Sequence, residues 1–287
     1  DEGATVPFIA RYRKEATGSL DEVQIAAIRD RLEQLRELDK RREAILKSLE
    51  EQGKLTDELK EKVGTAGTMA ILEDIYLPYR PKRRTKATIA KEKGLEPLAQ
   101  QILEQGDIDP LAAAAEFVDA AKGVETPEDA LSGARDIIAE SINEHELVRA
   151  KMREIFVNTA TFRCKVIAEK EEEGAKYRDY FDWEEPVAKA PSHRVLAMRR
   201  GATEGFLILR AIPNEDDAVA LIESLVVKGQ SAAAEQVRLA AKDCYKRLLC
   251  LSMETELRLE TKKRADEEAI RVFADNLRQL LLAAPLG

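Results

Sequence analysis

The sequence has few aromatic residues, cysteines and histidines. Aromatic residues make up 5% of its 287 positions and charged residues 35%, a balance typical of helical proteins with long solvated faces rather than of β-sandwiches. No apolar run is long enough to span a membrane, and no signal-peptide pattern is recognisable. We therefore expect a cytoplasmic protein in which Cys164, Cys244 and Cys250 are reduced thiols.

Motifs of catalytic and nucleotide-binding sites are also missing. Neither of the two histidines, His145 and His193, follows a spacing that places a base beside a nucleophile. The sequence contains neither a GxxxxGK[ST] loop nor a GxGxxG loop after a strand. Glu144 and Glu146 flank His145 on different helix faces, which is too little for a metal site. We therefore expect no enzymatic activity, no metal and no cofactor.

The charge balance restricts how nucleic acid can be bound. Acidic residues outnumber Lys and Arg by 54 to 46, and the formal net charge is −8. Dedicated nucleic-acid modules are usually basic, so any such binding has to come from local patches.

The stretch 71–98 contains the strongest of these patches. It begins with apolar residues at helical spacing and is interrupted by Pro78 and Pro81, which favour extended backbone at Leu77 and Arg80. A second helix is predicted to begin with Thr88 as its N-cap. Between the two helices the sequence predicts an exposed basic turn. Its five cationic side chains are Arg80, Lys82, Arg83, Arg84 and Lys86.

Two further clusters are weaker candidates for phosphate contacts. The first consists of Arg11, Arg13 and Lys14, and the second of Arg194, Arg199 and Arg200 beside His193. Cationic side chains in exposed turns can follow a phosphate backbone without reading bases. The alternative is that the cations pair with acids of neighbouring helices and stabilise the turns. Tyr76 and Tyr79 are either core residues or platforms on which unpaired bases stack.

The remaining sequence is predicted to be mainly helical. Asp21 opens a helix of about 30 residues with a partial heptad pattern, and Gly53 ends it. Residues 54–105 read either as a compact helix-turn-helix-like unit or as an irregular helical bundle. The apolar run 206–212 is the best strand candidate. The stretch 160–168 alternates in polarity and is either a short strand, the one other candidate for pairing with 206–212, or a helix or irregular extended piece, which we favour.

Two long helices, 231–251 and 252–283, are predicted to close the chain. The fold class is therefore mainly α, a multi-helix scaffold with at most a small two-stranded β element. We expect an N-terminal helical domain over 1–185 and a second region over 186–287.

Three motifs recur in one known family. They are GATVPFIARYRKE at 3–15, YLPYRPKRRTKATIAKEKGLEPLA at 76–99, and PSHRVLA at 191–197 followed by Arg200-Gly201. Together they resemble the Tex family of bacterial transcription-accessory proteins, which is related to a eukaryotic elongation factor of chromatin transcription. The first residues already lie inside a family motif, so we expect the chain to be a piece of a longer protein.

The resemblance implies a non-catalytic role in transcription. In this family the helical portion precedes an RNase-H-like domain that looks inactive, and helix-hairpin-helix and OB-fold nucleic-acid modules follow it. The chain would end where the RNase-H-like domain begins. We expect weak, sequence-independent binding of RNA or DNA, with the transcription machinery as a further partner. The alternative is a purely structural scaffold that docks on that machinery.

Overall fold

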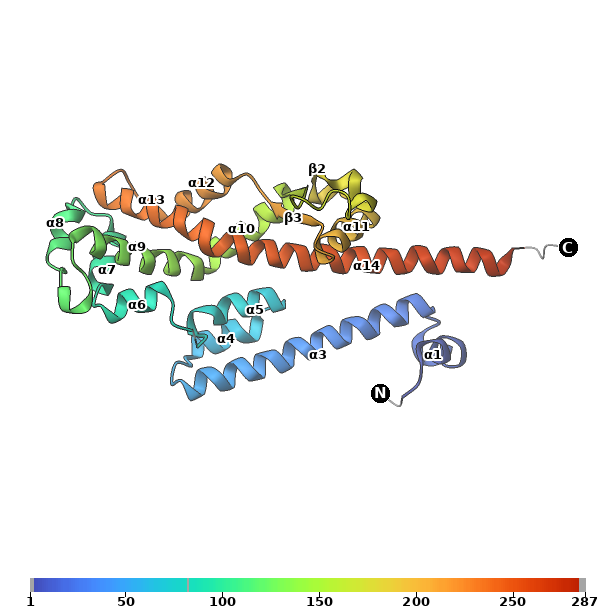
Figure 1. Cartoon of the computed structure of the whole chain (residues 1–287). Helices are drawn as coiled ribbons and strands as arrows, with labels where there is room; N and C mark the ends of the chain where they lie inside the picture. Colours follow the sequence, from blue (N-terminus) through green and yellow to red (C-terminus); the bar gives the residue numbers. More distant parts are fainter. Residues whose placement is uncertain (1–2, 82, 284–287) are drawn as a thin grey trace. The chain divides into compact units, whose positions relative to one another are not determined.

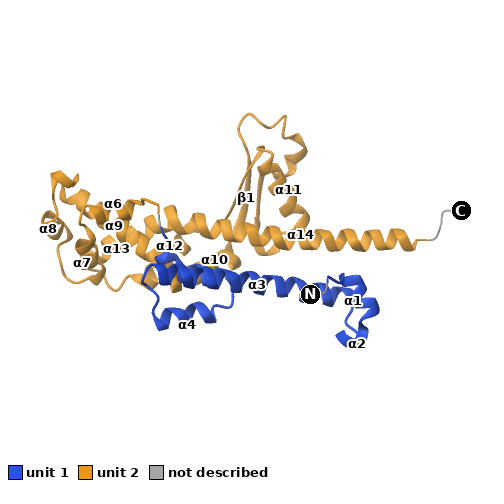
Figure 2. Ribbon diagram, turned by 90° about the horizontal axis from the view of Figure 1, so that it is seen from below, with its two compact units in different colours: residues 1–81 blue, residues 82–287 orange. Residues whose placement is uncertain are grey.

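The computed structural model describes residues 3–81 and 83–283 and confirms a mainly α-helical fold with a small antiparallel sheet (Figure 1). The chain divides into two compact units, 1–81 and 82–287 (Figure 2). We expected a division at 185/186, which lies inside the second unit.

The first unit contains helices joined by short loops and has no strand among its described residues. Its elements are α1 (Val6–Tyr12), α2 (Lys14–Thr17), α3 (Glu22–Glu51), α4 (Asp57–Thr65), α5 (Met69–Tyr76) and the 3₁₀ turn η1 (Leu77–Tyr79). Leu77 is helical, with φ −52° and ψ −43°, so the extended backbone predicted there is wrong. The 3₁₀ turn tightens the end of α5 and takes Leu77 into it despite the following proline.

Helix α3 has the ends that the sequence predicts. The backbone N–H of Gln24 donates to Asp21 Oδ1 at 2.8 Å, and Gln24 Oε1 accepts from the N–H of Asp21 at 3.0 Å. This reciprocal capping box satisfies two donors at the start of the helix. Gly53 follows the helix with φ +65°, the left-handed conformation that glycine adopts readily.

The C-terminal half of α3 supports a small core. Ile45 and Leu49 are buried there together with Val63 of α4 and Leu72 of α5. Arg42 interrupts the apolar seam and donates to the backbone oxygen of Ala66 at 2.5 Å. Towards the N-terminus, α3 carries exposed apolar side chains. These are Val23, Ile28, Leu32 and Leu35.

The second unit contains the remaining helices and the sheet. Its α-helices are α6 (Lys86–Glu92), α7 (Glu96–Glu104), α8 (Pro110–Ala115), α9 (Pro127–Glu144), α10 (Glu146–Thr159), α11 (Ser192–Thr203), α12 (Glu215–Val226), α13 (Ala232–Cys244) and α14 (Cys250–Leu282). Short 3₁₀ turns are η2 (Ala120–Lys122), η3 (Ala175–Tyr180) and η4 (Val187–Lys189). Helix α9 packs against α6, α7, α8 and α13. The stretch 54–105 is thus shared between the units, with α4 and α5 in the first and α6 and α7 in the second.

The sheet has three strands rather than the expected maximum of two. Strand β1 (Thr161–Val166) lies between β2 (Asp182–Pro186) and β3 (Leu207–Ile212), and both pairs are antiparallel. The run 206–212 is confirmed as a strand. The stretch 160–168 is a strand as well, because its alternating pattern buries Phe162 and Cys164 on one face. Strand β2 has few residues of high β-propensity, so the sequence alone did not indicate it.

The two long helices predicted at the end of the chain form one continuous rod. Helix α13 passes through the π-helical segment η5 (Tyr245–Leu249) directly into α14 (Figure 1). Ser252 was expected to begin a second helix, but it lies inside the rod, where its hydroxyl donates to the backbone oxygen of Leu249 at 3.1 Å. The last part of α14 exposes large apolar side chains. They include Ile270, Phe273, Leu277, Leu280 and Leu281.

Candidate nucleic-acid interface

The basic turn crosses the division between the two units, with Arg80 in the first and Arg83, Arg84 and Lys86 in the second. At the end of the first unit, Arg80 is exposed and its backbone is extended, with φ −64° and ψ 131°, as predicted. In the second unit, α6 begins three residues earlier than predicted. Thr85 rather than Thr88 is the N-cap, because Thr85 Oγ1 accepts from the N–H of Thr88 at 3.0 Å. Lys82 lies outside the described residues.

The start of α6 presents three exposed cations, Arg83, Arg84 and Lys86. Arg84 Nη2 lies 2.8 Å from Glu92 Oε2, but both side chains are more than half exposed, so the pair adds little stability. No ion pair joins Arg83 or Lys86 to a carboxylate of the described residues. Local acids therefore pair with one of the three cations.

The two tyrosines of this stretch take different positions in the first unit. Tyr76 is buried, its hydroxyl lies 2.8 Å from Ser48 Oγ, and the Arg41 guanidinium lies 5.7 Å from the ring centroid. It is therefore a core residue, and its ring is closed to bases. Tyr79 is half-buried and packs against the same core, which leaves part of its ring accessible.

The first weaker cluster is exposed in the first unit. Arg11 ends α1, and Arg13 and Lys14 form the junction with α2. None of the three forms an ion pair with another described residue. Tyr12 stacks at an angle on Phe8, with ring centroids 5.3 Å apart. The cluster is therefore accessible to an anion.

The second weaker cluster is largely committed to internal contacts. Arg194 pairs with Glu185 at 2.9 Å and lies over the Trp183 ring. Arg199 donates to the backbone oxygen of Arg258 at 2.9 Å, and burial lowers its pKa, with Arg258 adding repulsion. Arg200 is exposed, as is His193. The structure thus places Arg194 and Arg199 in the packing between α11 and its neighbours, and leaves Arg200 free to reach solvent.

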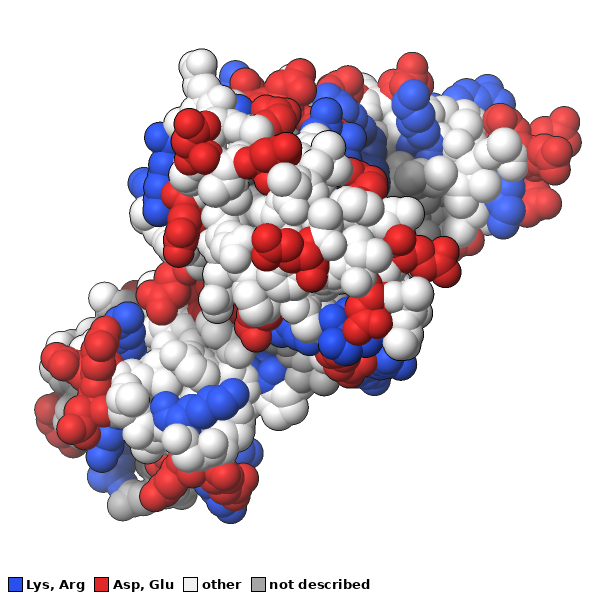
Figure 3. All heavy atoms as spheres, turned by 90° about the vertical axis from the view of Figure 1, so that its left-hand side faces the viewer, with Lys and Arg blue, Asp and Glu red and all other residues white. Residues whose placement is uncertain are grey.

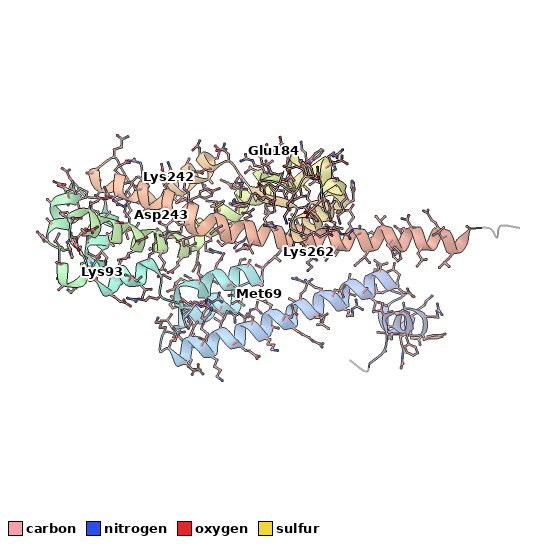
Figure 4. The ribbon with its side chains drawn as sticks, viewed as in Figure 1. Met69, Lys93, Glu184, Lys242, Asp243 and Lys262 are labelled. Atoms are coloured by element: carbon pink, nitrogen blue, oxygen red, sulfur yellow. The ribbon has the colours of Figure 1, made fainter. Side chains whose placement is uncertain are left out.

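Two cations that the sequence reading missed lie at the far end of α6. Lys93 follows the last turn of α6 (Figure 4), and its Nζ donates to the backbone oxygen of Gly123 at 2.7 Å. Lys122 lies beside it in η2, 3.4 Å from Asp119. The left-handed turns at Gly94 and Gly123, with φ +85° and +72°, allow the two segments to approach. Lys86 and Lys93 are seven residues apart, a spacing that could have indicated a shared helix face.

A groove of about 310 Å³ lies between α6 and α9. It is lined by Lys86, Ile89, Ala90, Lys93 and Leu95 on one side and by Gly123, Asp129, Ser132, Gly133 and Asp136 on the other. The groove thus has cations from α6 opposite carboxylates from α9.

The two carboxylates differ in their surroundings. Hydrogen bonds from the side chain and backbone of Thr126 lower the pKa of Asp129, and Lys93 adds a smaller attraction. Burial raises the pKa of Asp136, although Arg247 Nη2 lies 2.8 Å from its Oδ1. Both Lys86 and Arg247 oppose that rise. Asp136 is therefore the less solvated of the two acceptors.

Other chemistry has little support in the described residues. They contain no group of three or more His, Cys, Asp and Glu side chains placed to hold a metal ion. Burial raises the pKa of the Cys164 thiol to about 11, which disfavours the reactive thiolate. In the described part of the chain, no helix combines the length and the apolar character required to cross a bilayer. On the face shown in Figure 3, Lys and Arg are interspersed with Asp and Glu, so basic areas are local.

Comparison with known proteins identifies the family. Residues 105–273 match the family described as Tex central region-like, and residues 1–50 match the Tex-like protein N-terminal domain. These two regions together include two of the three sequence motifs, whereas the basic turn lies between them.

Relatives resemble this chain over its whole length. It is 46% identical to protein YhgF of Escherichia coli and 44% identical to transcriptional accessory protein Tex of Neisseria gonorrhoeae. Both matches cover 100% of this chain and 38% of the relative, so the chain spans about two fifths of their length. A human relative, S1 RNA-binding domain-containing protein 1, is 28% identical over 98% of this chain and 30% of its own length. The chain belongs to the Tex family.

Proposed function

We propose that this chain is the N-terminal part of a non-catalytic, cytoplasmic transcription accessory protein, and that it binds RNA or DNA weakly through the phosphate backbone. The observation that carries the proposal is the set of exposed cations at the start of α6. Arg83 and Lys86 form no ion pair within the described residues, and Arg84 forms one exposed pair. An anionic polymer is the partner that such a surface attracts.

The chemistry of these side chains suits contacts to phosphate. Arginine presents a planar fork that can hold two phosphate oxygens at once, and Lys86 adds a point charge one turn away. Phosphate contacts of this kind position a strand without reading its bases. The relative from Neisseria gonorrhoeae is named a transcriptional accessory protein, and the human relative is named for an RNA-binding domain. These names support, for the longer protein, a role in which nucleic acid is present.

The salt dependence of binding tests the proposal. If Arg83, Arg84 and Lys86 neutralise three phosphates of a single strand, log K falls against log salt with a slope of about −2. The measurement is fluorescence anisotropy of a labelled single-stranded RNA at several salt concentrations. The double variant R83E/R84E is expected to bind at least about tenfold more weakly and to show a flatter slope.

A matched double variant controls for net charge. Arg271 and Arg278 are exposed on α14 and form no ion pair among the described residues. R271E/R278E changes the net charge by the same amount and is expected to retain most of the affinity. Equal binding by R83E/R84E and the unmodified chain would assign the basic turn to structure. An equal loss in both variants would assign the effect to net charge, and either result would overturn the proposal.

The second candidate function is a protein-interaction scaffold. It is favoured by the exposed apolar side chains of α14, such as Phe273 and Leu281, which are 69% and 75% exposed. Exposed apolar patches often mark interfaces with other proteins. If the chain shows no salt-dependent binding to single-stranded RNA, the scaffold function is the one that remains.

The absence of catalysis is part of the proposal and has its own test. Purified chain is expected to leave labelled RNA and DNA intact during prolonged incubation with and without Mg²⁺. Reproducible cleavage that one point variant abolishes would overturn the non-catalytic assignment.

A further inference from the structure

Helix α1, at the N-terminal end of α3, presents two aromatic side chains to solvent (Figure 2). Phe8 is 44% exposed and Tyr12 is 63% exposed. In the described part of the chain, Phe273 is the one other aromatic side chain with comparable exposure. Aromatic rings are more often buried, because each removes a large apolar surface from water. Two exposed rings in contact on one short helix therefore mark a candidate binding surface.

The packing of α1 leaves both rings on its outer side. The helix packs against α3 with Ala10 buried and Ile9 half-buried. Phe8 and Tyr12 are four residues apart, so they lie together on another face of the helix. Their ring centroids are 5.3 Å apart, with 44° between the ring planes. Because Phe8 packs against it, the Tyr12 ring is already partly ordered before a ligand binds, and its outer side stays open to solvent.

Three exposed cations lie next to the aromatic pair. Arg11 is on the same side of α1 as the rings, and Arg13 and Lys14 follow at the junction with α2. None of them forms an ion pair with a carboxylate of the described residues, including Glu15, which directly follows Lys14. The carboxylate of Asp21 already accepts from the backbone at the start of α3. The positive charge beside the rings is therefore available to an external anion.

An unpaired nucleic-acid strand offers partners for both kinds of side chain. Its bases have flat faces that stack on aromatic rings, and its phosphates attract arginine and lysine. A duplex offers its phosphates to such a surface, but its bases are already stacked on one another. An acidic protein segment offers carboxylates to the cations but no aromatic surface to the Tyr12 ring. The combination of exposed rings and unpaired cations therefore favours a single strand.

We propose that the exposed face of α1 binds an unpaired nucleic-acid strand, in which one base stacks on Tyr12 and the adjoining phosphates pair with the three cations. The site rests on the proposed function for its class of ligand, nucleic acid. Its residues lie in the first unit, whereas Arg83, Arg84 and Lys86 lie in the second. Phosphate contacts carry no information about the bases, whereas stacking requires an unpaired base. The face of α1 thus adds a preference for single strands to the contacts at the start of α6.

The first test measures binding of a labelled RNA strand, alone and annealed to its complement, by fluorescence anisotropy. The variant Y12L removes the ring and keeps an apolar side chain. It is expected to bind the single strand about tenfold more weakly, the loss of one stacked base, and to change duplex binding by less than about twofold. The variant Y12F retains the ring and is expected to bind the single strand within about twofold of the unmodified chain.

The variant F273L is the matched control. It makes the same kind of change at the other exposed aromatic side chain, on α14, and is expected to leave binding of both ligands unchanged. Tyr12 and Phe273 are both mostly exposed, so neither substitution removes core packing. Full single-strand affinity in Y12L, or equal losses in Y12L and F273L, would overturn the stacking site and leave the face of α1 to a protein partner.

Photocrosslinking locates the bound base without any substitution. A strand that carries 5-iodouridine crosslinks on irradiation to aromatic side chains stacked against the modified base. Mass spectrometry of the digested complex is expected to find the crosslink at Tyr12 or Phe8. Crosslinks found only elsewhere in the chain would overturn the α1 site, even if the chain binds the strand.

The α1 site and the proposed function fail separately. If R83E/R84E weakens binding of strand and duplex while Y12L weakens neither, the contact at the start of α6 stands and the α1 site falls. If Y12L and the crosslink behave as expected while R83E/R84E has no effect, the α1 site stands and the contact at α6 falls. The absence of binding to either ligand removes both proposals.

Discussion

A Cβ atom added at Gly133 would lie 2.3 Å from Cδ1 of Leu95. Leu95 is buried in front of α7, and Gly133 lies inside α9, so the missing side chain allows the start of α7 to pack closely on α9. The Ala90 methyl group lies 3.4 Å from the same point.

The variant G133A is expected to destabilise the second unit. Overpacking against Leu95 costs about 1–3 kcal/mol, and it outweighs the gain of about 1 kcal/mol that alanine brings to a helix interior. G64A is the control, because Gly64 lies in α4 and a Cβ there meets nothing within 4 Å. Thermal unfolding should show a lower midpoint for G133A and an unchanged or higher midpoint for G64A. A rise in both would mean that Leu95 moves aside at little cost.

The variant Y76F is expected to destabilise the first unit. The substitution keeps the buried ring but removes the hydroxyl that lies 2.8 Å from Ser48 Oγ, at a cost of about 0.5–1.5 kcal/mol. Y79F should change stability by less than about 0.5 kcal/mol, since the half-buried Tyr79 hydroxyl has no hydrogen-bond partner among the described residues. Urea unfolding measures both. Equal effects of the two substitutions would contradict the assignment of Tyr76 as the anchored core residue.

Local signals predicted the start of two long helices. The helices expected to begin at Asp21 and Ser231 do so, because each of these residues places a side-chain oxygen before a run of helical periodicity. Where two candidate caps lie close together, local reading failed. Thr85 and Thr88 are both threonines, and only the fold shows that the helix begins at the first.

Features that depend on partners distant in the sequence were not predictable. Strand β2 exists because β1 pairs with it, and its own residues indicate no strand. The groove depends on α6 and α9 lying antiparallel, which the turns at Gly94 and Gly123 permit. The basic turn, in contrast, was visible in the sequence as a run of cations. The sequence did not show that Arg194 and Arg199 are engaged in packing.

The three thiols are expected to react slowly in the folded chain. Burial raises the pKa of Cys164 to about 11 and that of Cys244 to about 12, and it also raises the pKa of Cys250. An unfolded cysteine has a pKa of about 8.5, so at pH 8 the thiolate fraction of Cys164 is lower by a factor on the order of 100. Alkylation should therefore be slow in buffer and fast for all three thiols in denaturant. One thiol that reacts rapidly in the folded chain would show that its site opens to solvent.

Glu254 connects α14 to the sheet, and its removal is expected to be costly. Its buried carboxylate accepts from Arg210 Nε at 2.9 Å and from the backbone N–H of Ala211 at 2.8 Å. The variant E254A leaves the buried N–H of Ala211 without an acceptor. It also removes the carboxylate partner of Arg210, whose side chain is 44% exposed and can partly rehydrate. We expect a loss of about 2–3 kcal/mol, below the range for a fully buried pair because of that rehydration.

The variant E254Q separates the charge of Glu254 from its role as an acceptor. The amide oxygen can still accept from Ala211, so the expected loss is about 1 kcal/mol. Urea unfolding at neutral pH compares the two variants. If E254Q were as unstable as E254A, the charge–charge attraction to Arg210 would be the main contribution. If neither variant lost stability, the carboxylate would be dispensable, and the attachment of β3 to α14 would rest on the apolar contacts of Leu209 and Met253 in the same core.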